Sequence, residues 1–242
     1  VDPFSVKNNY FRSFKFPDFD DLYWNQPGTY YIGNPNLRPE DGWGVDLILE
    51  FNPASWLGLE SSAYYQWTDD SIHWVKYAGA WKPQNAGVGT FVGWDTRITG
   101  EIPFAWGPFN GINLTLSHRY LQSWLLSGEF SYADNKRIPY MPLHTIGATV
   151  DIPWNSASQT SAGSLLVSGH YETLRYADTG NLMELDPYFL LTITVNQRLG
   201  RRLSASAVVR NAVNALYTSF AEYPMPGITA TVGIRVLFDD LI

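Results

Sequence analysis

The sequence holds four histidines, the side chains that most often bind metals or transfer protons near neutral pH: His73, His118, His144 and His170. None of them stands in the H-E-x-x-H spacing that places two metal ligands and a base on one helix face. His144 follows the Pro139 to Pro142 stretch and is better interpreted as guiding a loop into its strand. Cysteine is absent, which excludes disulfides and thiolate metal sites. We therefore predict neither catalytic histidines nor a histidine metal site.

Aspartates gather near one expected strand end, at positions 18, 20 and 21. Such a cluster could bind a hard cation, which takes several oxygen ligands. The alternative, which we favour, is a solvated loop whose charges face water. The pairs Asp69-Asp70 and Asp239-Asp240 receive the same interpretation. No metal ligand, and no cofactor, is assigned.

Other enzyme and nucleic-acid signals are missing. Gly87, Gly89 and Gly93 superficially suggest a nucleotide-binding loop, but their spacing is wrong and no helix or βαβ unit surrounds them. No G-x-S-x-G nucleophile motif occurs. The net charge is −7 without a basic cluster, which argues against nucleic-acid binding. These absences favour a protein that is not an enzyme.

Aromatic residues in the expected loops are the best candidates for ligand binding. Their large, partly polar rings could contact a bulky, partly apolar ligand. Alternatively, they pack loops together or belong to an aromatic girdle at a membrane interface. Both interpretations stay open for each of these residues: Tyr23, Trp24, Tyr30, Tyr31, Trp81, Trp124, Tyr132 and Tyr140.

The elements that must position these loops are strands. From Ile228 to Phe238 apolar residues alternate with Thr229, Thr231, Gly233 and Arg235, which is the period of a strand with one apolar face. About ten such stretches occur, and we expect strands over these residues: 4–16, 42–51, 56–76 with a bulge or kink at 69–71, 89–102, 111–122, 143–153, 163–176, 187–198, 203–211 and 228–238. Charges on these strands fall mostly on the polar face.

The connections alternate between short and long. The turns at 52–55, 103–110, 154–162 and 199–202 are short, whereas the loops at 17–41, 77–88, 123–142, 177–186 and 212–227 are longer. No apolar run approaches 18 residues, so we expect no transmembrane helix. Alternating loop lengths and abundant aromatics, 10 Trp, 15 Tyr and 13 Phe, are typical of an up-and-down transmembrane β-barrel. The aromatics also suit a soluble carbohydrate-binding sandwich, which is the remaining all-β alternative, but the alternating loop lengths do not.

Several motifs then resemble one family, and they stand in that family's order. They are Phe14-Lys-Phe-Pro17-Asp-Phe-Asp-Asp21-Leu-Tyr-Trp24, Gly33-Asn-Pro-Asn-Leu-Arg-Pro39-Glu40, Ile72-His-Trp74 with Trp81-Lys-Pro83-Gln-Asn85, Pro139-Tyr-Met-Pro142-Leu-His144, and Val209-Arg-Asn211-Ala-Val-Asn-Ala-Leu-Tyr217 with Tyr223-Pro-Met-Pro-Gly227. The chain resembles the C-terminal half of a TonB-dependent outer-membrane receptor, nearest to the vitamin B12 and siderophore type. The stretch Thr231-x-Gly233-x-x-Val236-x-Phe238 resembles the signal read by the barrel-assembly machinery.

This resemblance implies an all-β antiparallel segment of about ten strands from a larger, 22-stranded barrel. Residues 1–242 would be its C-terminal portion, without the plug domain and the earlier strands. The complete protein would capture a scarce, bulky nutrient such as a ferric siderophore or cobalamin, contact outer-membrane lipid, and be driven by TonB through its missing N-terminal region. Two departures are the residues 239–242 after the terminal aromatic and Ile228 in place of arginine.

Two expectations concern the alternatives and the chain's beginning. An even strand number also permits a self-contained ten-stranded outer-membrane enzyme, a protease or lipase. No catalytic constellation supports it.

Val1-Asp-Pro-Phe lacks the basic and apolar regions of a signal peptide, so we expect a mature chain or a fragment.

Overall fold

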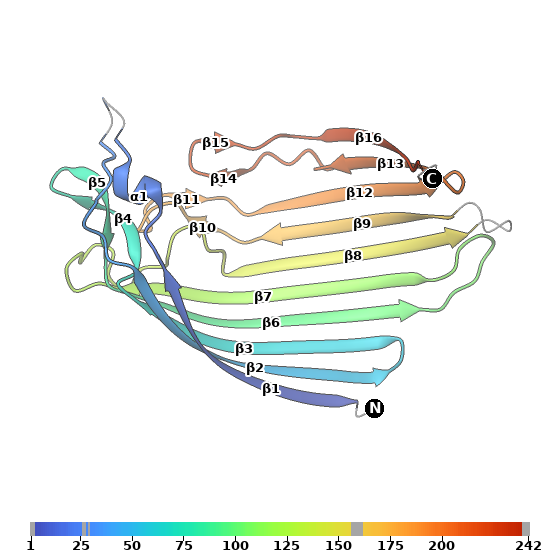
Figure 1. Ribbon diagram of the computed structural model, residues 1–242, viewed down its shortest axis with the longest axis horizontal. Coiled ribbons are helices and arrows are strands. Elements are labelled where there is room, and N and C mark those ends of the chain that lie inside the picture. The colour runs from blue at the N-terminus through green and yellow to red at the C-terminus, as the bar shows by residue number, and fades with distance from the viewer. Residues whose placement is uncertain (1–2, 26–27, 29, 156–161, 239–242) are drawn as a thin grey trace.

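One antiparallel sheet of ten strands dominates the computed structural model, which describes residues 3–25, 28, 30–155 and 162–238 (Figure 1). Each strand pairs with the strands of this sheet that come before and after it along the chain, so the chain runs up and down. In spatial order the strands are β1 (Phe4–Lys15), β2 (Glu40–Ala54), β3 (Leu57–Asp69), β6 (Val88–Ile102), β7 (Ile112–Leu126), β8 (His144–Asn155), β9 (Ala162–Glu172), β12 (Tyr188–Arg198), β13 (Leu203–Arg210) and β16 (Thr229–Val236). The predicted all-β, antiparallel up-and-down fold class is confirmed.

The small elements gather at one end of the sheet, which we call the loop end. They are helix α1 (Phe19–Tyr23) and the hairpins β4 (Ile72–Tyr77) with β5 (Ala80–Asn85), β10 (Arg175–Tyr176) with β11 (Glu184–Leu185), and β14 (Thr218–Phe220) with β15 (Tyr223–Pro224). The opposite end, the turn end, carries short connections and both chain ends (Figure 1). No helix in the described part of the chain is long and apolar enough to cross a membrane. The predicted alternation of short and long connections is therefore present, although most of the turn at 154–162 and the pair Asp239-Asp240 lie outside the described residues.

The expected single strand over 56–76 is wrong. Its main-sheet part ends at Asp69, and Asp70 takes a left-handed backbone conformation with φ 54°. The chain then leaves the sheet and forms the separate β4–β5 hairpin. Ala78 and Gly79, with φ of 50° and 84°, make the tight turn that the twist of a two-residue hairpin requires. Likewise, the strand predicted over 163–176 ends at Glu172, and residues 175–176 pair with β11 instead.

The register places apolar residues of successive strands side by side on one face. Residues opposite each other in antiparallel strands point to the same face of the sheet. In one row Val150 pairs with Val167, which pairs with Ile193, and Ile193 pairs with Val209. In another row Leu59, Ile98 and Leu116 are opposite one another. The sheet therefore has one continuous apolar face.

Aromatic side chains lie near both ends of this apolar face. Towards the loop end Trp43 pairs with Trp67, and the Tyr10 ring lies 5.5 Å from the Trp43 ring. Towards the turn end Trp106 stacks on Phe109 with ring centroids 6.3 Å apart, and Phe109 meets Trp154 edge to face at 6.4 Å. Two aromatic belts that bracket an apolar band are the arrangement of a membrane-spanning sheet.

The opposite face is polar and carries ion pairs between strands. Lys7 pairs with Glu50, and Arg119 binds both carboxylate oxygens of Asp95 at 2.9 and 3.0 Å. One ion pair lies on the apolar face, where the sequence predicted few charges. Arg12 binds Asp41 at 2.8 and 2.7 Å and lies 5.0 Å from the Trp43 ring centroid. This ion pair lies within the aromatic belt at the loop end. Charged side-chain ends at that level reach the polar membrane interface, which explains why the apolar face tolerates the pair.

The sheet is open in the described part of the chain. β1 and β16 are its two edges and each pairs with one neighbour only. The structure therefore shows neither a closed ten-stranded barrel nor two sheets packed as a sandwich, and both alternatives lose their structural basis.

The apolar core lies among the loops and not between sheet layers. Val75 and Ala86 from the β4–β5 region pack with Leu125 and Ile138, together with Phe130 and Ala133. This cluster covers the loop end of β6 and β7, to which Phe91 and Leu125 belong. It holds the loops in place over the polar face.

The two faces can be tested with neighbouring residues on β12. We expect Ile193→Arg to lower the unfolding free energy of the full-length protein in lipid by ~2–4 kcal/mol, because Ile193 lies on the apolar face in the middle of the sheet, where an arginine would meet lipid. Thr194→Arg, which faces the polar side, is the matched control and should cost much less. Reversible urea unfolding in lipid vesicles measures both values. Equal costs would contradict this assignment of faces.

Candidate functional site

The first layer of the site is a hydrogen-bonded junction between distant loops. The Trp74 indole N–H donates to Asp21 Oδ1 at 3.0 Å, and Asn34 Nδ2 donates to the Pro83 carbonyl at 3.1 Å. Gly33 is buried here, and a Cβ on it would lie 2.7 Å from the Trp24 backbone nitrogen. These contacts join the stretch around α1, the Gly33–Glu40 stretch and the β4–β5 hairpin. Three of the sequence motifs thus meet in one place.

Asn85 is the most connected side chain of this junction. Its Oδ1 accepts the Arg38 N–H at 2.9 Å, and its Nδ2 donates to the Arg38 and Asp70 carbonyls, both at 2.8 Å. Nearby, Glu40 Oε1 accepts the Ile72 N–H at 2.6 Å. An amide side chain can satisfy a donor and an acceptor of the backbone together, so one asparagine fixes both segments.

Backbone pairing then aligns three aromatic rings. The Ile32 N–H donates to the Trp81 carbonyl at 3.0 Å, and the Trp81 N–H donates to the Tyr30 carbonyl at 2.6 Å. As a result the Tyr31 ring stacks on Trp81, with centroids 6.4 Å apart and planes at 12°. Tyr31 also lies 5.9 Å from the Trp74 ring.

These rings form part of the wall of a cavity of about 750 Å³ at the loop end. Its walls come from α1, the β4–β5 hairpin, the loop before β8, the β10–β11 connection and the tip of β14–β15. The lining residues are Asp20, Trp24, Tyr31, Ile72, His73, Trp74, Trp81, Ile138, Pro139, Tyr140, Ala177, Asp178, Thr179, Met183, Ala221 and Glu222. We call this cavity the aromatic pocket. Its volume suits a bulky ligand.

Polar side chains fix the far walls of the aromatic pocket. Asp178 accepts the N–H groups of Gly180 at 3.0 Å, Leu182 at 2.9 Å and Met183 at 2.7 Å, which closes the turn between β10 and β11. On the other wall Tyr140, with φ 62°, donates its N–H to the Tyr176 carbonyl at 2.7 Å.

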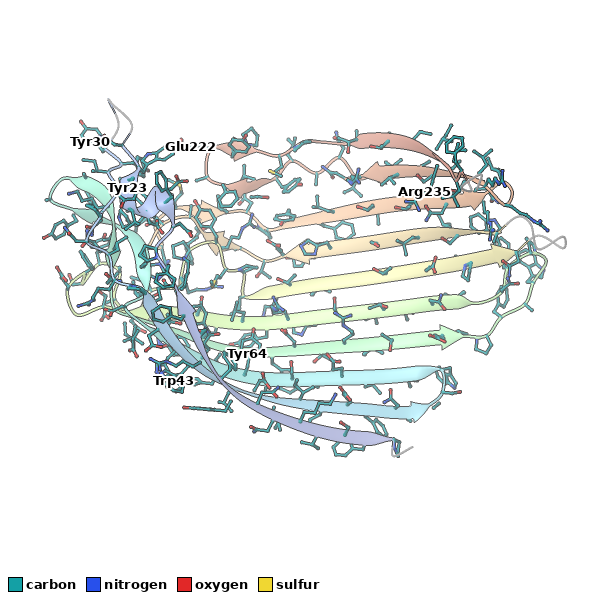
Figure 2. All side chains as sticks on the ribbon, in the orientation of Figure 1. Tyr23, Tyr30, Trp43, Tyr64, Glu222 and Arg235 are labelled. Carbon is teal, nitrogen blue, oxygen red and sulfur yellow. The ribbon has the colours of Figure 1, made fainter. Side chains whose placement is uncertain are left out.

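Two asparagines hold the stretch that carries Glu222. Asn211 Nδ2 donates to the carbonyls of Ala215 at 2.9 Å and Pro226 at 3.2 Å. Asn214 Oδ1 accepts the Ile228 N–H at 3.0 Å. Both asparagines have left-handed backbones, with φ of 50° and 51°, which asparagine tolerates better than most residues. Figure 2 shows Glu222 at the same end of the sheet as Tyr23 and Tyr30, far from Arg235 at the turn end.

His73 is the titratable group of the pocket with a clearly altered pKa. Burial disfavours its charged form, and the charge of Lys15 adds to this, so its pKa falls from 6.5 to about 4. The Nε2 atom lies 2.9 Å from Ser71 Oγ. At neutral pH His73 is therefore an uncharged hydrogen-bonding group.

Four of the eight aromatic candidates line the aromatic pocket: Trp24, Tyr31, Trp81 and Tyr140. The other four do not. Tyr23 packs on Phe19 at 5.0 Å, and Tyr30 is 75% exposed. Tyr132 Oη accepts the Lys76 N–H at 2.6 Å, so it ties loops together, and Trp124 pairs with Thr90 on the apolar face. Four of the loop aromatics therefore line a cavity and four lie elsewhere, and ligand contact by the four lining residues stays a prediction.

Sequence reasoning did not select several lining residues, among them Trp74, His73, Asp178, Met183 and Glu222. Trp74 and His73 were available in the Ile72-His-Trp74 motif, which was interpreted only as a family signature. Nothing in the sequence pattern pointed to Glu222, because its place depends on how the β14–β15 stretch meets the other loops.

The remaining candidate groups form no metal site in the described residues, where no cluster of three or more His, Asp or Glu side chains is found. His118 Nε2 lies 3.0 Å from His144 Nδ1 on the apolar face, and His170 Nε2 lies 3.0 Å from Glu172. Of the aspartate cluster, Asp18 precedes α1 and Asp21 binds the Trp74 indole.

Residues 1–212 match the family model described as TonB dependent receptor-like, beta-barrel. The chain belongs to this family. The resemblance seen in the sequence is thereby confirmed, and with it a place in the outer membrane. The family and its relatives are receptors and transporters, which agrees with the expectation of a protein that is not an enzyme.

Known relatives extend well beyond the region that matches this chain. The chain is 28% identical over 207 residues to the vitamin B12 transporter BtuB of Vibrio vulnificus, covering 84% of this chain and 29% of that protein. It is 25% identical over 229 residues to the vitamin B12 transporter BtuB of Photobacterium profundum, covering 90% and 33%. The crystal structure of the ferric yersiniabactin uptake receptor FyuA from Yersinia pestis superposes with a TM-score of 0.69 at 16% identity, covering 99% of this chain and 36% of that one. The last likeness supports the fold alone.

The junction predicts a local stability effect. We expect Asn85→Ala to lower the free energy needed to open the β4–β5 hairpin by ~1–3 kcal/mol, because two backbone segments lose their shared partner. Amide hydrogen exchange in the complete receptor measures this opening. Gln84→Ala, at the neighbouring position, is the control and should leave exchange nearly unchanged. A similar effect of both changes would argue against the role of Asn85.

The pKa of His73 predicts an acid-sensitive hairpin. The folded pKa of about 4 lies below the ordinary value of 6.5, so the unfolded hairpin binds a proton first as pH falls. The stability that the uncharged His73 contributes to the hairpin should therefore be fully present above pH 6.5 and decline as the pH falls towards 4. We expect His73→Gln to remove most of this decline, measured as the difference in exchange protection between the two proteins at each pH. Identical pH profiles would contradict it.

Proposed function

We propose that this chain is the C-terminal part of the barrel of a TonB-dependent outer-membrane receptor that imports a scarce, bulky nutrient. The observation that carries the proposal is the aromatic pocket of about 750 Å³ at the loop end of a family barrel wall. A cavity of this kind binds by shape and aromatic contact. The proposed activity is therefore binding and import.

The likeness to the two vitamin B12 transporters supports cobalamin or a similar bulky chelate, such as a ferric siderophore, as the nutrient. In this proposal the loop end is extracellular, and the apolar face contacts outer-membrane lipid. TonB acts through a region of the complete protein that precedes this chain.

The open sheet and the relatives' lengths support a larger barrel. Edges of a sheet expose unpaired backbone groups, which lipid does not satisfy. In the proposal, strands outside residues 1–242 pair with β1 and β16, and a plug domain fills the space beside the polar face. The enzyme alternative has no comparable support, because neither the relatives nor a catalytic constellation favour it.

The loop aromatics offer a direct test. We expect Trp81→Ala in the complete receptor to weaken binding of the imported chelate about tenfold, because the wall of the aromatic pocket loses a large ring that stacks on Tyr31. Trp124→Ala is the control, since this tryptophan lies on the apolar face outside the pocket. Equilibrium binding to purified receptor, with cobalamin and ferric siderophores as probes, gives the two affinities. If Trp81→Ala and Tyr140→Ala both leave every affinity unchanged, the pocket is not the binding site.

A further inference from the structure

We infer that the aromatic pocket selects neutral or cationic chelates and disfavours strongly anionic ones. This inference rests on the proposed import function and specifies the class of nutrient that the pocket admits. Three features of the lining carry it: the sign of its charged side chains, the engagement of nearby arginines elsewhere, and the faces of its aromatic rings.

Every charged side chain among the described lining residues is acidic. Asp20, Asp178 and Glu222 line the cavity, whereas no lysine or arginine does. The Asp178 carboxylate accepts three backbone N–H groups, which partly offset its charge. Asp20 and Glu222 are exposed and form no ion pair in the described part of the chain. These two carboxylates keep their negative charge available to a ligand.

The arginines close to the lining in sequence are used to hold loops. Arg38 pairs with Asp70. Arg137 donates to the Met141 carbonyl at 3.1 Å and lies 5.9 Å from the Tyr176 ring. Arg175 is only 2% exposed, donates to the Thr218 carbonyl and lies 4.9 Å from the Tyr188 ring. None of these three contributes a positive surface to the cavity.

His73 does not change this balance near neutral pH. Its pKa of about 4 keeps the imidazole uncharged, so it offers hydrogen bonds without positive charge. A receptor site for a strongly anionic ligand would instead present guanidinium or ammonium groups, which bind such ligands best.

The aromatic rings favour the same class of ligand. The face of an aromatic ring is electrostatically negative and attracts cations, most strongly for tryptophan. Tyr31, Trp74 and Trp81 form a connected group in this wall, and Trp24 and Tyr140 add further ring surface. A neutral ligand gains apolar contact there, a cationic one gains in addition, and an anionic one is opposed by carboxylates and ring faces together.

The test compares three probes on the complete receptor. They are a trianionic ferric tris-catecholate, a neutral cobalamin and a monocationic ferric trihydroxamate, measured by equilibrium binding at low and high salt. We expect the neutral or the cationic probe to bind and the trianionic probe to bind least. Salt should weaken the cationic probe and strengthen the anionic one, because ions screen both attraction and repulsion.

Charge-removing variants connect the preference to named residues. Asp20→Asn combined with Glu222→Gln should weaken the cationic probe by roughly two- to fivefold and strengthen the anionic one by a similar factor, which is the range for exposed charge pairs. Glu129→Gln removes one charge from an exposed loop position outside the lining and is the control for long-range effects.

Each outcome decides between the two proposals. Tightest binding of the tris-catecholate, or equal binding of all three probes, overturns the charge inference and leaves the import function in place. A preference for neutral or cationic probes that the double variant does not change also overturns it. Failure of every probe to bind or to be taken up by cells carrying the receptor overturns the proposed function and, with it, the inference.

Discussion

Backbone hydrogen bonding is the constraint on which the rest of this structure depends. Hydrocarbon offers no partner for an N–H or a carbonyl, so a lipid-facing sheet must satisfy these groups through its own strands. The register of the ten strands does so from β2 to β13 on both sides. Because side chains alternate along each strand, the same register sorts them into an apolar and a polar face. The composition of the strands, their length and the face on which each side chain lies are consequences of that one requirement.

The loops follow a different rule, because no second layer packs over most of them. A small apolar cluster around Val75 and Leu125 contributes, but the larger part of their order comes from short polar side chains that bind backbone groups. Asn85 joins two segments, and Asn211 and Asn214 hold the stretch from β13 to β16. The family motifs contain these asparagines. In this chain the three asparagines therefore hold the walls of the aromatic pocket in place, but their own side chains do not line it.

Much of the sheet could be predicted from the sequence, because a period of two is a local signal. Strands such as β7 and β16 carry it in their own residues. The signal failed at Asp69–Ser71, where the stretch after the break still resembles a strand. Whether the chain continues in the main sheet or starts a new hairpin depends on the left-handed Asp70 and on the partner that residues 72–77 meet, and neither is visible in the periodicity.

The pocket was less predictable for a related reason. Aromatic type alone selected Trp24, Tyr31, Trp81 and Tyr140 together with Trp124 and Tyr132, although the last two face the apolar side and another loop. Which aromatic residues line the pocket depends on which loops meet in space. Glu222 shows the limit most clearly, since its place at the cavity depends on how the β14–β15 stretch, which Asn211 and Asn214 hold, meets the other loops.

Charge placement links the sheet to the pocket. Some acidic groups of the polar face have cationic partners, as in Lys7 with Glu50 and Arg119 with Asp95, and even the exceptional Arg12 on the apolar face is bound by Asp41. In these cases the strands bring the opposite charge to the same face, so the pair is nearly neutral. Asp20 in α1 and Glu222 in the turn between β14 and β15 lie outside the main sheet and form no ion pair among the described residues. These two carboxylates stand beside stacked rings in a lining that contains acidic side chains and no lysine or arginine. A ligand without excess negative charge is the one that matches such a lining.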